Sequence, residues 1–164
     1  MIHIIVATGN RGEIGYKNQL LCHLSADLKH FKELTTGHTI LMGRKTWDSL
    51  PKKPLPNRRN LVVSRNGNLR LKGAEVFTSP EAALKTIGIG EDLFIIGGEQ
   101  IYKLFMDKAD TLHLTRILAN FEADAFFPEI NPAEWELKEE IPFEKDEKNP
   151  YNFVFQTFTR KKIQ

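Results

Sequence analysis

The chain has 164 residues, 41% apolar and 27% charged, which suits one ordinary globular domain with a sizeable core. A net charge of +2 with scattered Lys and Arg does not support nucleic-acid binding, and no apolar run is long enough to span a membrane. The single cysteine excludes an intrachain disulfide and a cysteine-based zinc site, and with no recognisable signal peptide we expect a cytoplasmic protein.

The first half of the chain predicts strands that alternate with helices. Ser25 has the character of a helix N-cap and predicts a helix from there to about Thr35. The segment 10–15 predicts a loop with glycine hinges, and Pro51–Asn57 is too rich in proline to be regular. The other predicted elements are strands at Ile2–Thr8, Thr39–Met42 and Asn60–Ser64 and a short helix at Trp47–Leu50.

The second half continues this alternation and then changes character. We predict strands at Glu75–Thr78, Leu93–Ile96 and Thr111–Leu118, and helices from Ser79 to about Ile87 and at Glu99–Met106. Two long segments, Trp135–Phe143 and Phe153–Lys161, have no helix between them and predict an antiparallel hairpin. The whole pattern indicates an α/β fold with a mainly parallel sheet and antiparallel edge strands.

Asp27 is the only carboxylate between Ile14 and Phe31. Helical spacing places it on one face with Leu24, Phe31 and Leu34. A charge on an apolar face is costly without a partner, so Asp27 is a candidate site residue. The alternative is a solvated carboxylate that complements the dipole of the first helical turn.

Three segments at predicted strand ends suit an anionic ligand. Each combines glycine, hydroxyl or cationic groups with the start of a helix or the end of a strand, where phosphates commonly bind. Because parallel strands end at one edge of the sheet, together they indicate a ligand with several phosphates, such as a dinucleotide. The segments are Gly43-Arg44-Lys45-Thr46, Ser64-Arg65 and Ile95-Ile96-Gly97-Gly98.

Taken together, these motifs resemble the dihydrofolate reductase family, and the resemblance extends from near the first residue of the chain to its last. The order and spacing of the matching motifs hold throughout. The matching residues are Ala7, Ile14-Gly15, Ala26-Asp27-Leu28 with Phe31, Met42-Gly43-Arg44-Lys45-Thr46-Trp47, Pro54-Leu55-Pro56-Asn57-Arg58, Ile96-Gly97-Gly98 with Tyr102, Leu114-Thr115, and Asp124 with Phe127-Pro128.

The resemblance implies a central, mainly parallel eight-stranded sheet with a C-terminal antiparallel hairpin, flanked by four helices. It implies one domain over residues 1–164, with an adenosine-binding lobe at about 39–90. The implied activity is NADPH-dependent reduction of dihydrofolate to tetrahydrofolate, which supports one-carbon metabolism and thymidylate, purine and glycine synthesis. We therefore expect a monomer that binds NADPH, dihydrofolate and antifolate-type inhibitors, without a metal, a membrane or a nucleic acid.

By this resemblance Asp27 binds the pterin ring through two hydrogen bonds and favours protonation of the imine nitrogen. Thr115 would hydrogen-bond Asp27, and Leu20 and Cys22 complete the catalytic part of the site. The guanidinium of Arg58 would hold the glutamate carboxylate of the substrate. The implied substrate-binding residues are Ile5, Asp27, Leu28, Phe31, Leu50, Arg58, Ile96 and Thr115.

The resemblance also implies a cofactor site. Thr46 and Gly98 would bind the pyrophosphate, and Arg44, Ser64 and Arg65 the adenosine 2′-phosphate. The family's Gly-Gly peptide is cis, and the loop Asn10–Leu24 would close over the nicotinamide. The implied cofactor-binding residues are Ala7, Ile14, Gly15, Gly43, Arg44, Lys45, Thr46, Val63, Ser64, Arg65, Gly97, Gly98, Gln100, Ile101 and Tyr102.

The sequence departs from the family at Leu21-Cys22, where Pro-Trp is usual. Cys22 is interpreted as a small buried hydrophobe in preference to a reactive thiol. Two other functions stay open at this point. One is a related reductase acting on a pyrimidine intermediate of riboflavin synthesis, against which Asp27, Phe31 and Arg58 argue. The other is a non-catalytic nucleotide- or folate-binding protein, against which the pair Asp27–Thr115 argues.

Overall fold

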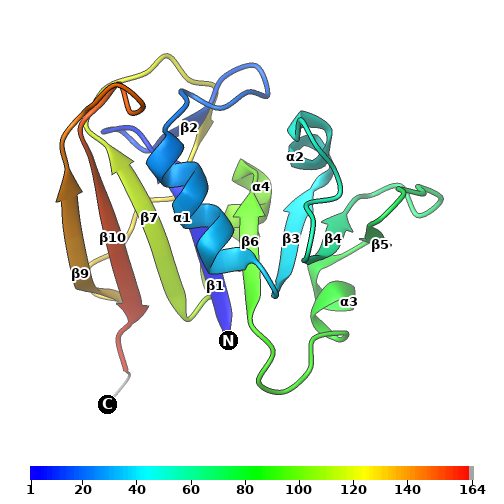
Figure 1. The fold of residues 1–164 in the computed structure, drawn as a ribbon. Coiled ribbons are helices and arrows are strands. Elements are labelled where there is room, and N and C mark those ends of the chain that lie inside the picture. The colour runs from blue at the N-terminus through cyan, green and yellow to red at the C-terminus, as the bar shows by residue number, and fades with distance from the viewer. Residues whose placement is uncertain (163–164) are drawn as a thin grey trace.

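An eight-stranded sheet forms the centre of the computed structural model, which describes residues 1–162 (Figure 1). Its strands are β1 (Ile2–Thr8), β3 (Thr39–Gly43), β4 (Arg59–Val63), β5 (Glu75–Phe77), β6 (Leu93–Gly97), β7 (Thr111–Ile117), β9 (Trp135–Phe143) and β10 (Phe153–Arg160). The helices are α1 (Ser25–Thr35), α2 (Arg44–Ser49), α3 (Pro80–Leu84) and α4 (Glu99–Phe105). A separate pair joins β2 (Glu13–Gly15) to β8 (Ala125–Phe126).

The strand order of the large sheet is β5-β4-β3-β6-β1-β7-β10-β9. The pairs from β5 to β7 are parallel, and β10 runs antiparallel to both β7 and β9. In the pairing of β1 with β7, Ala7 lies opposite Thr115. The predicted mainly parallel sheet, its C-terminal hairpin and its four flanking helices are therefore confirmed.

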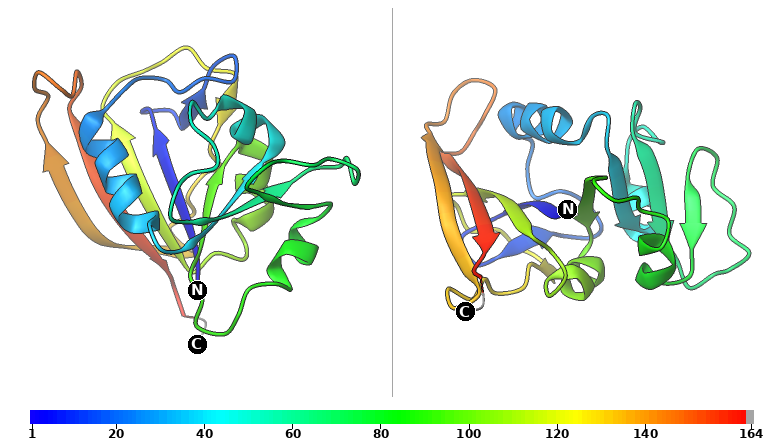
Figure 2. Two further views of the ribbon diagram at one scale, coloured as in Figure 1. Left: turned by 45° about the vertical axis from the view of Figure 1, so that its right-hand side comes forward. Right: turned by 90° about the horizontal axis from the view of Figure 1, so that it is seen from below.

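The helices cover the two faces of the sheet in pairs, α1 and α2 on one face and α3 and α4 on the other (Figure 2). Alternation along each strand directs side chains to both faces, so the sheet carries two apolar cores. In β1, Ile4 and Val6 pack on the side of α4, whereas Ile5 packs with Phe31 of α1. Burial on both faces explains why the strands read as continuous apolar runs.

The start of α1 differs from the prediction. Leu24 is the N-cap residue and Ser25 is the first residue of the helix, so the assignment of Ser25 as a cap was wrong. The amide of Ala26 instead donates to Asn149 Oδ1 at 2.9 Å. A side chain far along the chain thus replaces the local cap. By contrast, the predicted Ser79 cap of α3 is confirmed, because its Oγ accepts from the amide of Ala82 at 3.1 Å.

The segment 10–15 is not only a loop, since Glu13–Gly15 forms β2 and pairs with β8. Several other boundaries also differ from the prediction, most of them by one residue. Helix α2 begins at Arg44 rather than Trp47, β4 runs one residue earlier than expected, and α3 ends at Leu84 instead of Ile87. After Leu84 the chain forms turns closed by hydrogen bonds between residues three apart, such as the one from the amide of Ile87 to the carbonyl of Leu84. These turns keep a helix-like spacing of side chains without forming an α-helix.

Across residues 1–162, each helix is too short or too polar to cross a membrane. Within 39–90, the range predicted as an adenosine-binding lobe, lie β3, α2, β4, β5 and α3. The division of the chain into one domain with such a lobe stays a prediction. Its C-terminal limit at residue 164 lies outside the described residues.

A chain of three polar side chains ties β1 to its neighbours near the amino ends of the strands. His3 Nδ1 lies 3.0 Å from His113 Nε2, and His3 Nε2 lies 3.2 Å from Asp92 Oδ1. Only one proton fits between the two facing ring nitrogens, so the pair is stable with no more than one positive charge. Burial, with the nearby His3 and His30, lowers the pKa of His113 from 6.5 to about 4.

This arrangement predicts a loss of stability in mild acid. The unfolded chain takes up a proton at His113 below about pH 6.5, whereas the folded chain does so only near pH 4. The free energy of unfolding therefore falls as pH drops through this window, by on the order of 1 kcal/mol after allowance for solvent screening. Urea unfolding of wild type and His113→Gln at pH 7.5 and pH 5 measures it.

The variant should show a smaller difference between the two pH values than wild type. His23→Gln is the matched control, because it removes an exposed histidine that lies outside the pair. An unaltered pH dependence in His113→Gln would show that the pair does not titrate as described.

Candidate active site

Asp27 has a partner within the protein. The hydroxyl of Thr115 donates to Asp27 Oδ1 at 2.5 Å, joining α1 to β7 across the sheet face. Thr115 is only 3% exposed, and Asp27 is half-buried. The structure thus brings together the two residues that the resemblance to the family placed in contact.

Burial raises the pKa of Asp27 above its ordinary value, and the Thr115 hydrogen bond and the nearby His30 partly offset that rise. The carboxyl is therefore poised to exchange a proton or to pair with a cationic donor more readily than a solvated aspartate. One oxygen is occupied by Thr115, and no other hydrogen bond to the carboxylate forms within residues 1–162. The solvated interpretation of Asp27 was wrong.

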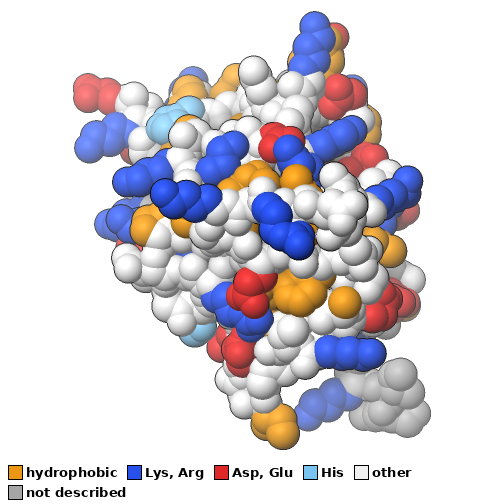
Figure 3. Space-filling model, turned by 90° about the vertical axis from the view of Figure 1, so that its right-hand side faces the viewer, with side chains coloured by type: hydrophobic (Ala, Val, Ile, Leu, Met, Phe, Trp, Pro, Cys, Tyr) orange, Lys and Arg blue, Asp and Glu red, His pale blue; other side chains and the backbone are white. Residues whose placement is uncertain are grey.

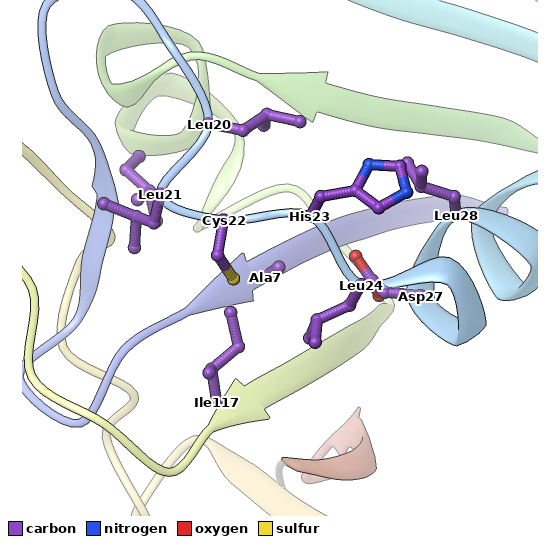
Figure 4. Close-up of a pocket in the computed structure, with 10 residues that line it drawn as sticks. Ala7, Leu20, Leu21, Cys22, His23, Leu24, Asp27, Leu28 and Ile117 are labelled. Carbon is purple, nitrogen blue, oxygen red and sulfur yellow. The ribbon is translucent and has the colours of Figure 1, made fainter. Parts of the chain in front are cut away.

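The carboxyl of Asp27 faces a pocket at the carboxyl ends of β1 and β7 (Figure 4). Five other predicted site residues line this pocket: Ala7, Ile14, Leu20, Cys22 and Leu28. Sequence reasoning did not include the remaining lining residues, Leu21, His23, Leu24 and Ile117, as site residues. Their closeness in sequence to predicted residues was the available signal for all four.

Cys22 is half-buried and packs with apolar residues, so the expected apolar environment is present although full burial is not. Figure 4 shows its sulfur directed toward Ala7 and Ile117, and it packs with the apolar cluster around Leu24. Burial raises the pKa of the Cys22 thiol, and the charge of Asp27 raises it further. A thiol that stays protonated at neutral pH is a poor nucleophile, so Cys22 contributes shape rather than reactivity.

The other predicted substrate residues extend the apolar surface away from the pocket. Ile5 belongs to the core cluster on the α1 face, and Phe31, Leu50 and Ile96 pack against that cluster. Arg58 lies beside the C-terminal end of α1, where its Nη1 donates to Thr35 Oγ1 at 3.0 Å and its Nε to the carbonyl of Pro56 at 2.9 Å.

The guanidinium of Arg58 also sits 5.9 Å from the ring centre of Phe31. It is therefore held in place, with donors to spare for an outside carboxylate. Asp27 lies in the first turn of α1, and Arg58 lies beside the other end of the helix. Phe31 is on the helix between these two positions.

The predicted phosphate segments meet where β3 and β6 end. A Cβ added at Gly98 would lie 3.4 Å from Thr46 Oγ1, so the starts of α2 and α4 are close neighbours. The Gly97-Gly98 peptide is cis, as the resemblance implied. Gly97 has φ of +124°, and a Cβ there would come within 3.2 Å of the Tyr102 hydroxyl, so a side chain is excluded on both grounds.

Basic side chains gather on the face that the β5 side of the molecule presents (Figure 3). Arg44 and Lys45 are exposed at the start of α2, and Ser64 and Arg65 follow β4. Arg44 Nε lies 3.0 Å from Asp48 Oδ1, an exposed pair that a phosphate could displace. Within residues 1–162 no hydrogen bond or ion pair joins Arg44 to Ser64 or Arg65, although Gly43 and Val63 pair where β3 and β4 end.

Four predicted cofactor residues lie around these segments in different settings. Ile101 packs on Gly43, where a Cβ would approach within 3.1 Å. The buried Tyr102 hydroxyl donates to the carbonyl of Ile5 at 2.9 Å and so ties α4 to β1. Gln100 is exposed on α4, and Val63 ends β4.

The base of the loop Asn10–Leu24 is fixed by a residue that the sequence did not single out. Glu13 is fully buried, and its carboxylate accepts from the amides of Arg11 and Phe121, the latter at 2.8 Å. These backbone donors lower the pKa of Glu13 despite its burial. An isolated carboxylate between Gly12 and Ile14 was the only local signal, because Phe121 lies 108 residues away.

Further along, the loop is tied at exposed points. The carbonyl of Gly15 accepts from the amide of Asp124 at 3.0 Å, and the amide of Lys17 donates to Asp124 Oδ2 at 3.0 Å. At the loop tip, Asn18 Nδ2 donates to the carbonyl of Lys45 at 3.1 Å. The loop therefore spans from the pocket around Asp27 to the start of α2.

Comparisons with known proteins agree with this geometry. The family model for dihydrofolate reductase matches residues 1–160. The dihydrofolate reductase of Bacillus subtilis strain 168 is 40% identical over 161 residues, covering 98% of this chain and 95% of that protein. That of Staphylococcus aureus strain N315 is also 40% identical over 161 residues, with 98% and 99% covered.

A solved structure extends the agreement to three dimensions. Dihydrofolate reductase from Enterococcus faecalis, complexed with NADP(H) and RAB-propyl, matches with a TM-score of 0.93 at 36% identity, covering 99% of this chain and 97% of that one. Sequence and fold agree over nearly the whole length, and the chain therefore belongs to the dihydrofolate reductase family.

Proposed function

We propose that the pocket around Asp27 carries out the reaction of the family, with NADPH as the hydride donor and 7,8-dihydrofolate as the acceptor. The observation that carries this proposal is the hydrogen-bonded pair of the half-buried Asp27 and the buried Thr115 at the pocket beyond β1 and β7. Family membership leaves no support for the alternative reductase of riboflavin synthesis.

Asp27 would bind and orient the pterin. Thr115 fixes one carboxylate oxygen, so the carboxylate plane is set before a ligand arrives. The amide N–H of a pterin ring and its neighbouring 2-amino group match a carboxylate as a bidentate pair, which orients the ring as well as binding it. The negative charge beside the ring would favour protonation of the imine nitrogen, after which the adjacent carbon is a better hydride acceptor.

Apolar side chains would enclose the rest of the substrate. Leu20 and Leu28 are 75% and 43% exposed, an unusual degree for large aliphatic residues at the edge of a pocket. Covering them with a ring system would remove that surface from water and exclude solvent from the reacting atoms. Phe31 would continue this wall toward Arg58, whose spare donors suit the glutamate carboxylate.

The residues at the ends of β3 and β6 fit a dinucleotide. Gly98 has no side chain and lies close to Thr46, so a pyrophosphate would have room there and donors to bind it. The exposed Arg44 and Arg65 suit a further phosphate. The nicotinamide, which supplies the hydride when bound, would then lie near Ala7 and Ile14, both lining the pocket of Asp27. A monomer acting in the cytoplasm stays a prediction.

The first test is NADPH oxidation on addition of dihydrofolate, for wild type and Asp27→Asn. Wild type should turn over, and the variant should keep its fold and NADPH binding but lose about a hundredfold or more at neutral pH. The difference in turnover between wild type and Asp27→Asn should become smaller as pH falls, because solvent then supplies the proton. Asp107→Asn, at an exposed carboxylate remote from the pocket, is the control.

Two outcomes would contradict the proposal. Wild-type rates in Asp27→Asn would remove this carboxylate from the mechanism. Tight binding of both ligands by wild type without turnover would instead support the non-catalytic binding protein.

Arg58→Leu tests the glutamate site. Loss of a charge-assisted hydrogen bond costs roughly 1.5–3 kcal/mol, so affinity for dihydrofolate should fall about tenfold or more. A dihydropterin lacking the glutamate should bind almost as before. Equilibrium binding of both ligands measures the difference, with the exposed Arg70→Leu as control. Equal losses for the two ligands would contradict the carboxylate role.

Arg44→Ala tests recognition of the 2′-phosphate. The variant should narrow the preference for NADPH over NADH by about tenfold, because the guanidinium pairs with a group that only NADPH carries. The ratio of kcat/KM for the two cofactors measures this preference. An unchanged ratio would assign the recognition to Ser64 and Arg65.

A further inference from the structure

A second hollow lies on the face of the sheet opposite Asp27. Its cavity volume is about 630 Å³, within the range of small-molecule sites. Three segments far apart in the sequence enclose it: the end of β1 with the base of the loop, the outer half of β7, and the chain after β8. The lining residues that carry charge or apolar surface are Arg11, Leu114, Arg116, Phe127, Pro128 and Glu129.

The strand order explains why this hollow exists. Helix α4 packs on β6 and β3, so on this face the carboxyl ends of β1 and β7 have no helix above them. The irregular segment 127–130 lies beside the end of β1 and the base of the loop there. Leu114 and Phe127, both members of the core cluster on the α4 face, form the apolar floor.

The charged groups of the hollow are two arginines and one glutamate. Arg11 is held by its Nη2, which donates to the carbonyl of Phe121 at 2.7 Å, and by Glu13, 3.5 Å from its Nε. Arg116 is exposed and makes neither an ion pair nor a side-chain hydrogen bond within residues 1–162. Glu129 is exposed at the rim. With Glu13 paired to Arg11 and its neighbouring amides, the hollow retains an unpaired guanidinium above an apolar floor.

We propose that this hollow binds small aromatic carboxylates. A guanidinium with free donors pairs with a carboxylate through two parallel hydrogen bonds, and Arg116 has all its donors available. A flat ring would rest on the half-buried Pro128 and on the small exposed parts of Leu114 and Phe127. Glu129 at the rim selects against ligands with a second negative charge on that side.

Occupation of the hollow would also act on the loop. Gly9–Gly12 forms one wall, and the amide of Gly12 donates to the carbonyl of Gly9 in the turn that carries Glu13. A ligand resting against this turn stabilises the conformation in which Glu13 is buried. On the proposed function, the same turn anchors the loop that lies over the pocket of Asp27.

The experiment is a nuclear magnetic resonance titration of the ¹⁵N-labelled protein with 2-naphthoate. The amides of Gly9, Gly12, Arg116 and Glu129 should shift together, with one dissociation constant. Those of Cys22, Asp27 and Leu28 should stay unchanged, which separates this site from the one in the proposed function. Shifts centred on Asp27, or none up to the solubility limit of the probe, would overturn the proposal.

Arg116→Gln tests the role of the guanidinium. The variant should weaken 2-naphthoate about tenfold, as expected for one charge-assisted pair. Arg70→Gln removes an exposed arginine elsewhere and should leave the dissociation constant unchanged. 2-Methylnaphthalene, which has the ring without the charge, should bind wild type and Arg116→Gln equally. An undiminished affinity of Arg116→Gln for 2-naphthoate would also refute the assignment.

Discussion

The hydrogen bond from Thr115 to Asp27 determines how the elements around the pocket must be placed. It places a carboxylate in a half-buried position and requires α1 to lie over β1 and β7 with its first turn at their carboxyl ends. Asn149, between β9 and β10, holds that first turn through the amide of Ala26. The site is thus assembled from three distant parts of the chain, and a shift in any of them would move the carboxylate.

The sequence predicted those features whose physical cause is local. Alternation and β-branched runs located the strands of the large sheet, the Ser79 cap located α3, and helical spacing placed Asp27 on the apolar face. Three features caused by distant partners escaped prediction, whereas the distant pair Asp27–Thr115 was expected only from the resemblance to the family. The pairing of β2 with β8, the cap of α1 by Asn149 and the burial of Glu13 each depend on residues more than 100 positions away.

The loop Asn10–Leu24 is held unequally along its length. At its base the carboxylate of Glu13 is fully buried and accepts backbone donors, which makes that contact costly to break. At its tip Asn18 and Lys17 make exposed hydrogen bonds, which water can replace at little cost. The tip of the loop can therefore move while its base stays in place, and Gly15 lies between the base and the tip.

The central position of β1 has a consequence for the synthesis of the protein. Strand β1 leaves the ribosome before its two partners, β6 and β7, whose residues lie between 93 and 117. Until those residues emerge, an apolar strand has both edges unpaired, a state in which chains associate with one another. The nascent chain must therefore keep β1 shielded until β6 and β7 have emerged, and only their arrival closes the middle of the sheet.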